Sequence, residues 1–396
     1  RTVAEGPVRG EIELAGTMRA GEESFGRFTF RVAAFAGLPC VRTRWRIYND
    51  RVETLDVARW ELVGDTSLDE AAPVAYEAGQ SPQAGPVWMR QPGVDRYEVS
   101  AGGAPVASTG MRASGWLGVS DGNTAILAGV RHFAEQFPCA LGYEDGRLHV
   151  RLFEPSDELP LYRPHEGEAK RHEVWLGLWG APKSAESMAT VASSWLAPAV
   201  LFDADYHCAT GAMGEAYPHD DTRFPELTRF MNEQGAQPDL GFGIRHGIRN
   251  WGDSPYKETL WCNGYYDRQQ GFAVEYLMTG GYDWFRRLEA TVLHIIDIDI
   301  CHRSHEHPEW EGAIHSLYSE DHSTGGIAST PWPPGQRTKG TLAYWRYTAD
   351  DAAREAALGV ADSAIRCGRG LGSISVRDHG GDIFARYIGL IHSRVG

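Results

Sequence analysis

The chain has 396 residues, more than one ordinary core requires, and its 42% hydrophobic and 23% charged residues indicate a globular protein with large cores. The formal net charge of −15 argues against nucleic-acid binding, because neutralising phosphates requires a basic surface. No apolar run is long enough to cross a bilayer, so the sequence predicts no membrane partner.

The first part of the chain predicts antiparallel strands. Residues 41–47 alternate apolar side chains with three arginines, which is the period of a half-buried strand, and residues 147–153 and 172–178 repeat this alternation. Many strands with no helices between them favour an antiparallel β-sandwich, which we place at residues 1–184. The segment 77–105 is rich in Gly, Pro, Ala and Gln and predicts a long insertion or loop within it.

After residue 185 the pattern becomes helical. Asp350 or Asp351 is a suitable N-cap for one of these helices, and Gly368 a suitable stop. Helices of similar length joined by loops rich in His, Trp, Gly and Pro are typical of α/α toroids. We therefore predict a toroid domain at 185–396, with helices at 187–195, 225–233, 282–300, 338–347, 351–366 and 382–392.

The predicted helices suffice for only part of a closed toroid, so we expect an incomplete ring. Arg1 is not an initiator methionine and lies in a strand-like segment. We therefore expect the chain to be a processed or truncated piece of a longer product, and we favour a secreted or periplasmic location over a cytoplasmic one.

Polar and aromatic residues gather in three clusters, at 245–253, 261–267 and 297–302. Six of the 15 histidines fall between His294 and His322, a density that favours a functional role. Structural interpretations stay open beside this one. Asp253 can cap a helix, Tyr265 and Tyr266 can be core rings, and Asp297 and Asp299 can be solvated or paired with Arg303. His305 and His307 are expected at the surface.

These residue types suit β-elimination from a uronic acid. The proton on C5 becomes acidic only when the neighbouring carboxylate charge is neutralised, which Asn, Arg, His or a cation can do. A His or Tyr then removes this proton, and a Tyr or His protonates the leaving oxygen on C4. A glycoside hydrolase requires two carboxylates flanking the scissile bond instead. Such a pair could come from Asp253, Asp267, Asp297 and Asp299, and a non-catalytic glycan-binding protein is a third alternative.

The sequence shows no CxxC or other zinc-ligand spacing, so we expect no metal cluster and no required cofactor. A histidine-rich segment can nevertheless bind a metal, and a divalent cation such as calcium stays open as an alternative.

The chain resembles the exo-rhamnogalacturonan lyase family. In the β part the resemblance is carried by Glu5-Gly-Pro-Val-Arg9, Phe35-Ala-Gly-Leu-Pro39, Gly115-Trp-Leu-Gly-Val-Ser-Asp-Gly122, Val130-Arg-His-Phe-Ala-Glu-Gln-Phe-Pro138 and Gly167-Glu-Ala-Lys-Arg-His172. In the helical part it is carried by Asn250-Trp-Gly-Asp253, Asn263-Gly-Tyr-Tyr-Asp267 and Asp297-Ile-Asp-Ile-Cys-His302. Each motif is short, and their order over most of the chain gives the resemblance its specificity.

The resemblance implies a central β-sandwich and a C-terminal α/α toroid, and a lyase acting on rhamnogalacturonan-like glycans. The family's N-terminal barrel has no counterpart here. Two turns also depart from the family: its His-Ser-Trp-like segment appears as Gln336-Arg-Thr-Lys-Gly340, and its Thr-Gly-Asp turn as Thr348-Ala-Asp350.

We therefore predict a polysaccharide lyase with a cleft between the toroid and the sandwich, and with an acidic polysaccharide or oligosaccharide as its partner. Tyr266 is the expected acid or base, His302 or His322 its partner, and Asn263 the residue that neutralises the carboxylate. The remaining predicted substrate-binding residues share charged, polar or aromatic side chains within the first two clusters. They are Arg245, His246, Arg249, Trp251, Asp253, Trp261 and Tyr265.

Overall fold

Strands make up every labelled element before residue 185 of the computed structural model. The described residues are 1–66, 68, 74–76, 79–81, 86–102, 104–198, 202–214, 216–220, 222–236, 247–253, 255–257, 260–261, 267–315 and 337–370. The strands are β1 (Thr2–Glu5), β2 (Arg9–Ala20), β3 (Glu23–Phe35), β4 (Cys40–Tyr48), β5 (Trp60–Asp65), β6 (Val74–Tyr76), β7 (Gly79–Ser81), β8 (Val87–Gln91), β9 (Tyr97–Ala101), β10 (Ala104–Gly110), β11 (Trp116–Ser120), β12 (Ala125–Val130), β13 (Cys139–Glu144), β14 (Arg147–Phe153) and β15 (Ala169–Trp179).

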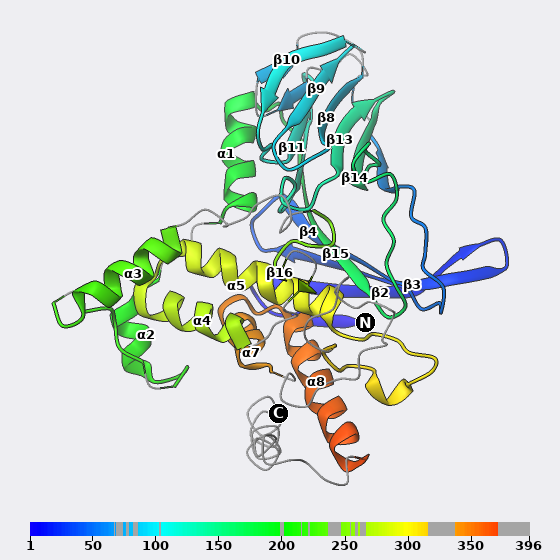
Figure 1. The fold of residues 1–396 in the computed structure, drawn as a ribbon. Helices are drawn as coiled ribbons and strands as arrows, with labels where there is room; N and C mark the ends of the chain where they lie inside the picture. The colour runs from blue at the N-terminus through cyan, green and yellow to red at the C-terminus, as the bar shows by residue number, and fades with distance from the viewer. Residues whose placement is uncertain are drawn as a thin grey trace.

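Helices dominate the described residues after position 185 (Figure 1). They are α1 (Ala185–Leu196), α2 (Ala204–Thr210), α3 (Pro225–Ala236), α4 (Arg268–Thr279), α5 (Tyr282–His294), the π-helical turn η3 (Ile295–Asp299), the 3-10 turn η4 (Pro308–Trp310), α7 (Lys339–Thr348) and α8 (Asp351–Gly370). A short hairpin, β16 (Pro255–Lys257) and β17 (Leu260–Trp261), interrupts them. No helix in these ranges has the length and apolar character needed to cross a bilayer.

The strands form two antiparallel sheets. One has nine strands in the order β1-β2-β3-β4-β15-β12-β11-β6-β7, and the other six in the order β10-β9-β8-β13-β14-β5. Alternate residues of β11 (Leu117, Val119) and β13 (Leu141, Tyr143) lie in one buried cluster, so the sheets pack face to face along part of their length. The antiparallel β structure predicted for this part of the chain is confirmed.

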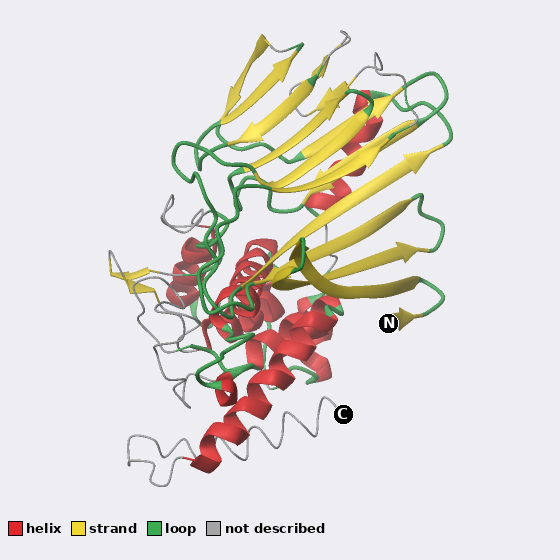
Figure 2. Cartoon of the chain, turned by 90° about the vertical axis from the view of Figure 1, so that its right-hand side faces the viewer, coloured by secondary structure: helices red, strands yellow, loops and turns green. Residues whose placement is uncertain are grey.

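The long strands β2, β3, β4 and β15 extend beyond this core and lie over the helical part (Figure 2). Trp284, Phe285, Leu288 and Val292 of α5 recur at helical spacing and pack with Tyr344 of α7, which explains why this helix forms here. The predicted change from strands to helices near residue 185 is confirmed. The described helices do not by themselves show a toroid.

Several local predictions need correction. Residues 77–105 contain the strands β7, β8 and β9 and the start of β10 rather than one long loop, because Val87 and Met89 join the buried core despite the Gly- and Pro-rich composition. Helix α8 continues through Gly368 to Gly370. The predicted helix 282–300 is α-helical only to His294 and then becomes a π-helix. The Asp350 N-cap is confirmed, since its Oδ1 accepts the Ala352 N–H at 3.0 Å. The segment 382–392 lies outside the described residues.

Candidate functional site

Charged residues form a row across four strands of the large sheet. The register places Glu13 opposite Arg31, Arg31 opposite Arg44, and Arg44 opposite Glu173. Residues directly opposite each other on antiparallel strands share a face of the sheet, so the four side chains project to one side. The Nε of Arg31 donates to Glu13 at 2.6 Å, and the Nε of Arg44 donates to Glu173 at 3.1 Å.

A second row lies two residues along the same strands. Thr29 is opposite Arg46, and Arg46 is opposite Arg171. The pattern at 41–47 predicts a half-buried strand, yet Arg44 and Arg46 are 7% and 9% exposed. The arginine face of β4 is covered by the helical part, and like charges directly opposite one another are destabilising unless counter-charges are supplied.

The helices supply these counter-charges. Asp350, before α8, contacts Arg44 at 3.2 Å and Arg171 at 3.0 Å, and Asp297 of η3 contacts Arg46 at 3.0 Å. Burial by itself would raise the pKa of the Asp350 carboxyl, but the guanidinium groups of Arg171 and Arg44 outweigh burial and hold the pKa well below its usual range. The sheet and the helices are therefore joined through a buried network of fixed charges.

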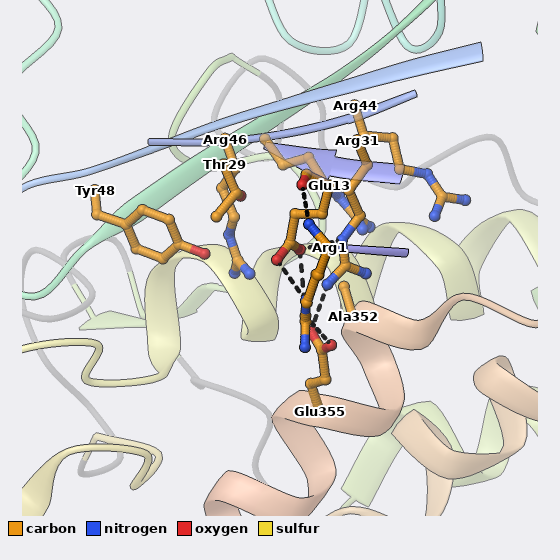
Figure 3. A pocket seen from close by; sticks show the side chains of 10 residues that line it. Arg1, Glu13, Thr29, Arg31, Arg44, Arg46, Tyr48, Ala352 and Glu355 are labelled. Atoms are coloured by element: carbon orange, nitrogen blue, oxygen red, sulfur yellow. Dashed lines mark hydrogen bonds and ion pairs between the residues drawn. The ribbon is translucent and has the colours of Figure 1, made fainter. Parts of the chain in front are cut away.

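A cavity of about 210 Å³ opens within this network (Figure 3). For scale, an engineered cavity of about 150 Å³ accommodates benzene, so a six-membered ring fits this volume. Five arginines and two glutamates give the lining a positive balance. The lining residues are Arg1, Glu13, Thr29, Arg31, Arg44, Arg46, Tyr48, Arg171, Ala352 and Glu355.

Tyr48 lies at one side of this cavity, with its hydroxyl directed toward the side where the guanidinium groups gather (Figure 3). The guanidinium carbons of Arg27 and Arg46 lie 4.5 and 5.1 Å from the centre of its ring. His302 packs edge-on against the same ring at 5.2 Å. Tyr48 is thus held between cations and an imidazole and presents a polar group to whatever the cavity binds.

His302 is placed behind Tyr48 rather than in the lining of this cavity. Its Nε2 lies 2.7 Å from the carbonyl oxygen of Ile296, which can only accept, and 3.3 Å from Nη2 of Arg46, which can only donate. The shorter contact assigns the proton to Nε2 and the lone pair to Nδ1. Burial, reinforced by the charge of Arg46, lowers the pKa of His302 well below its usual value. The ring is therefore neutral at physiological pH.

A second group of titratable side chains is buried beside η3. Ligand-type atoms of Asp253, His294 and Asp299 all lie within 4.8 Å of one another. Burial lowers the pKa of the adjacent His315 to about 4, despite the carboxylates of Asp299 and Glu168 nearby. The sequence left open whether Asp299 is exposed to solvent. The structure excludes this alternative, since the side chain of Asp299 is fully buried.

The predicted site residues that the structure describes have different environments. Arg249 contacts Glu168 through its Nη2 at 2.7 Å, and Trp251 is buried with its ring 4.3 Å from that of His132. Trp251 therefore presents no open stacking surface, because the loop that carries it packs onto the β part. Trp261 is half-buried in β17. The others, Arg245, His246, Asn263, Tyr265, Tyr266 and His322, lie outside the described residues.

The described histidines of the segment 294–322 do not form one group. His294 and His315 are buried near Asp299, and His302 lies against Tyr48. His305 is exposed and contacts Glu166, and the half-buried His307 contacts Glu309 at 3.2 Å. The surface location predicted for His305 and His307 agrees with these contacts.

The sequence pattern did not predict the arginine-lined cavity. The alternation of arginines in 41–47 was recognised as a strand signal, but the cavity also draws on β2, β3, β15 and α8. Three arginines at alternate positions of one strand are unusual on an ordinary solvent face. This density of arginines is the sequence feature that could have indicated a charged site on this face of β4.

Comparisons with known proteins give no family. No protein-family model matches the sequence, and no curated protein sequence is significantly similar. An aldose 1-epimerase-like structure from Klebsiella pneumoniae covers 49% of this chain at 10% identity and a TM-score of 0.31. A TPR-domain containing protein from Parabacteroides distasonis covers 91% at 9% identity and a TM-score of 0.29, and a GH36 α-galactosidase from Geobacillus stearothermophilus covers 46% at 12% and 0.26. This chain spans 56%, 58% and 26% of these three structures, and likenesses this weak carry no functional argument.

Proposed function

We propose that this protein is a polysaccharide lyase of the exo-rhamnogalacturonan lyase type, which cleaves a uronic-acid-containing glycan by β-elimination. In this proposal the helices after residue 185 are part of an α/α toroid, and substrate binds where they meet the long strands of the large sheet. The cavity lined by arginines and Tyr48 is the observation that carries the proposal.

The charge of the cavity suits a uronate. A carboxylate placed among Arg31, Arg44 and Arg46 has its charge balanced by guanidinium groups that ion pairs already hold in place. Neutralising this charge makes the proton on C5 of the sugar more acidic, and the fixed groups need no reorganisation during the reaction. A net charge of −15 would by itself repel an anionic substrate. The positively charged lining of the cavity can offset this repulsion, because a bound carboxylate responds to the local field more than to the net charge.

Tyr48 provides a hydroxyl for proton transfer in this cavity. In the proposed step a base takes the C5 proton, the electron pair forms the new C4–C5 double bond, and the C4–O bond breaks as an acid protonates the leaving oxygen. Tyr48 is suited to the acid role, and the imidazole of His302 holds the ring of Tyr48 in position. The predicted roles of Tyr266, His322 and Asn263 remain predictions, since these residues lie outside the described part of the chain.

The hydrolase alternative gains little support from the four aspartates that the sequence offers for it. It requires two carboxyl groups across an open cleft, about 5–10 Å apart. Asp297 is engaged by Arg46 and by the N–H of Arg171, and Asp267 accepts the N–H of Gly340 at 3.3 Å. Asp253, Asp267, Asp297 and Asp299 are each no more than 8% exposed, so none flanks an open groove.

Product analysis tests the proposal. The full chain is incubated with rhamnogalacturonan, with polygalacturonate and with a neutral galactan as the control polymer. We expect ultraviolet-absorbing unsaturated uronate to accumulate with an acidic polymer and not with the neutral one. Saturated reducing sugar as the only product, or no turnover of any acidic polymer, contradicts the proposal.

A further inference from the structure

Three potential metal ligands converge from two segments of the helical part. Asp253 ends the loop 247–253, His294 ends α5, and Asp299 ends η3. The three residues are 4%, 2% and 0% exposed. The Nε2 of His294 lies 3.7 Å from Oδ2 of Asp253 and 3.2 Å from Oδ1 of Asp299. Together they form a compact, buried donor set of two carboxylates and one imidazole.

The π-helical turn brings two of these ligands together. Residues five apart in a regular α-helix, such as His294 and Asp299, point about 140° away from each other at 100° per residue. In η3 the backbone forms an i to i+5 hydrogen bond instead, from the Ile300 N–H to the Ile295 carbonyl at 3.0 Å. The wider turn places positions five apart on one face, and such turns occur frequently at functional sites.

The separations between the donor atoms suit a bound cation. When ligand atoms lie about 2.1 Å from a metal, neighbouring donors are about 3.0 Å apart in an octahedral site and about 3.4 Å apart in a tetrahedral one. The two separations from the Nε2 of His294, 3.2 and 3.7 Å, are close to these values.

His294 is also oriented as a metal ligand. Its Nδ1 lies 3.1 Å from the carbonyl oxygen of Trp251, which can only accept, so Nδ1 donates and Nε2 faces the two carboxylates. Histidines that bind metals generally donate their second ring N–H to a carbonyl or carboxylate in this way. Nε2 thus faces two carboxylates, and either a proton on this nitrogen or a metal ion bound between the three groups balances their charge.

Asp299 supplies an independent indication of a ligand. Its side chain is fully buried, and its Oδ2 accepts no hydrogen bond from any residue that the structure describes. A buried carboxylate oxygen without a partner is costly, and natural proteins generally satisfy such atoms.

We propose that Asp253, His294 and Asp299 bind one divalent transition-metal ion, such as Zn²⁺ or Mn²⁺. The imidazole favours these ions over Ca²⁺, which prefers oxygen ligands in a larger shell. The ion fastens the loop 247–253 to the end of α5 and to η3. This site is independent of the proposed lyase activity, and its test needs no substrate.

The first experiment uses the full wild-type chain. Metal content is measured by mass spectrometry after dialysis, and Tm is measured after chelation and after adding Zn²⁺, Mn²⁺ or Ca²⁺ alone. We expect close to one Zn²⁺ or Mn²⁺ per chain, a lower Tm after chelation, and a rise of several degrees when Zn²⁺ or Mn²⁺ is restored. A chain without stoichiometric metal whose Tm responds to none of these ions overturns the proposal, and a proton on His294 then satisfies the carboxylates.

Two variants locate the binding. Asp299→Asn removes one charged ligand, and we expect it to lose the bound metal and the rise in Tm. His307→Asn is the matched control, because it removes a surface imidazole that faces Glu309, and we expect it to keep both. Loss of metal in His307→Asn with retention in Asp299→Asn overturns the proposal. If Asp299→Asn does not fold, the wild-type metal content and chelation results decide the question.

Discussion

Arg131, directly after β12, and Glu289, in the middle of α5, form a bidentate ion pair. The Nη1 and Nη2 atoms of Arg131 donate to the two carboxylate oxygens at 3.0 and 2.8 Å, and the hydroxyl of Tyr344 donates to the same carboxylate at 3.0 Å. Burial would raise the pKa of Glu289, but Arg131 and His132 outweigh it and hold the pKa far below its usual range. The pair fixes the helices against the sheet.

The first prediction concerns this pair. Glu289→Gln removes the closer of the two carboxylates that face the buried guanidinium of Arg131 and leaves only Glu173, at 3.6 Å, so we expect the free energy of unfolding to fall by about 3–5 kcal/mol. Glu135→Gln is the control, because Glu135 pairs at 3.5 Å with the half-exposed Arg286, and we expect a loss of no more than about 1 kcal/mol. Urea unfolding measures both. Equal losses in the two variants would show that the buried pair has no special importance.

The sequence predicted the elements better than their assembly. Strands at 41–47, 147–153 and 172–178 are found within β4, β14 and β15, because alternation of apolar residues is a local signal. The helix at 282–300 was predicted from the spacing of Phe285, Leu288 and Val292, but its last residues form η3. A switch from α to π geometry depends on packing around the turn and leaves no period in the sequence.

The candidate site was less predictable for a related reason. Arg31, Arg44 and Arg171 come from strands far apart in the sequence and share a face only because of the register of β3, β4 and β15. Their carboxylate partners, such as Asp350, belong to another part of the chain. Neither register nor partner choice is encoded locally, so the arginines of 41–47 indicated a strand without indicating what covers it.

The second prediction concerns pH. Burial raises the pKa of Asp267 to about 6, despite the opposing effects of the Gly340 N–H and the Arg337 charge. An acid whose pKa is higher in the folded state binds its proton more tightly there, so folding loses stability as pH rises from about 4 to about 6. This loss reaches about 3 kcal/mol for a shift of this size.

Asp267→Asn removes the charge that is unfavourable above pH 6. We expect this variant to be more stable than the wild type at pH 7 and to lose the advantage near pH 4. Unfolding in urea at a series of pH values measures the difference, with Asp283→Asn on exposed α5 surface as the control. An Asp267→Asn variant that is less stable than the wild type at pH 7 would show that the charged carboxylate stabilises the fold.

The third prediction concerns Gly252, whose φ of +99° favours glycine. A Cβ there would lie 2.1 Å from the carbonyl oxygen of Ala290 and 2.9 Å from the Cβ of His294. Gly211 also has a positive φ, of +63°, but its Cβ would meet nothing within 4 Å. We expect Gly252→Ala to lose about 1–3 kcal/mol more in the free energy of unfolding than Gly211→Ala. Losses of the same size would mean that the loop 247–253 is free to move away from α5.

The fourth prediction concerns Tyr48 and follows from the proposed lyase activity. Tyr48→Phe keeps the ring between Arg46 and His302 and removes only the hydroxyl, so we expect an unchanged Tm and a fall in kcat of about 10²–10⁴-fold. Tyr206→Phe is the control, because Tyr206 is exposed on α2, outside the cavity, and we expect its kcat to match the wild type. The rate of release of unsaturated uronate measures kcat for the wild type and the two variants, and thermal unfolding measures their Tm. If Tyr48→Phe retains full activity, proton transfer must be assigned to another group, and the predicted Tyr266 is then the next residue to replace.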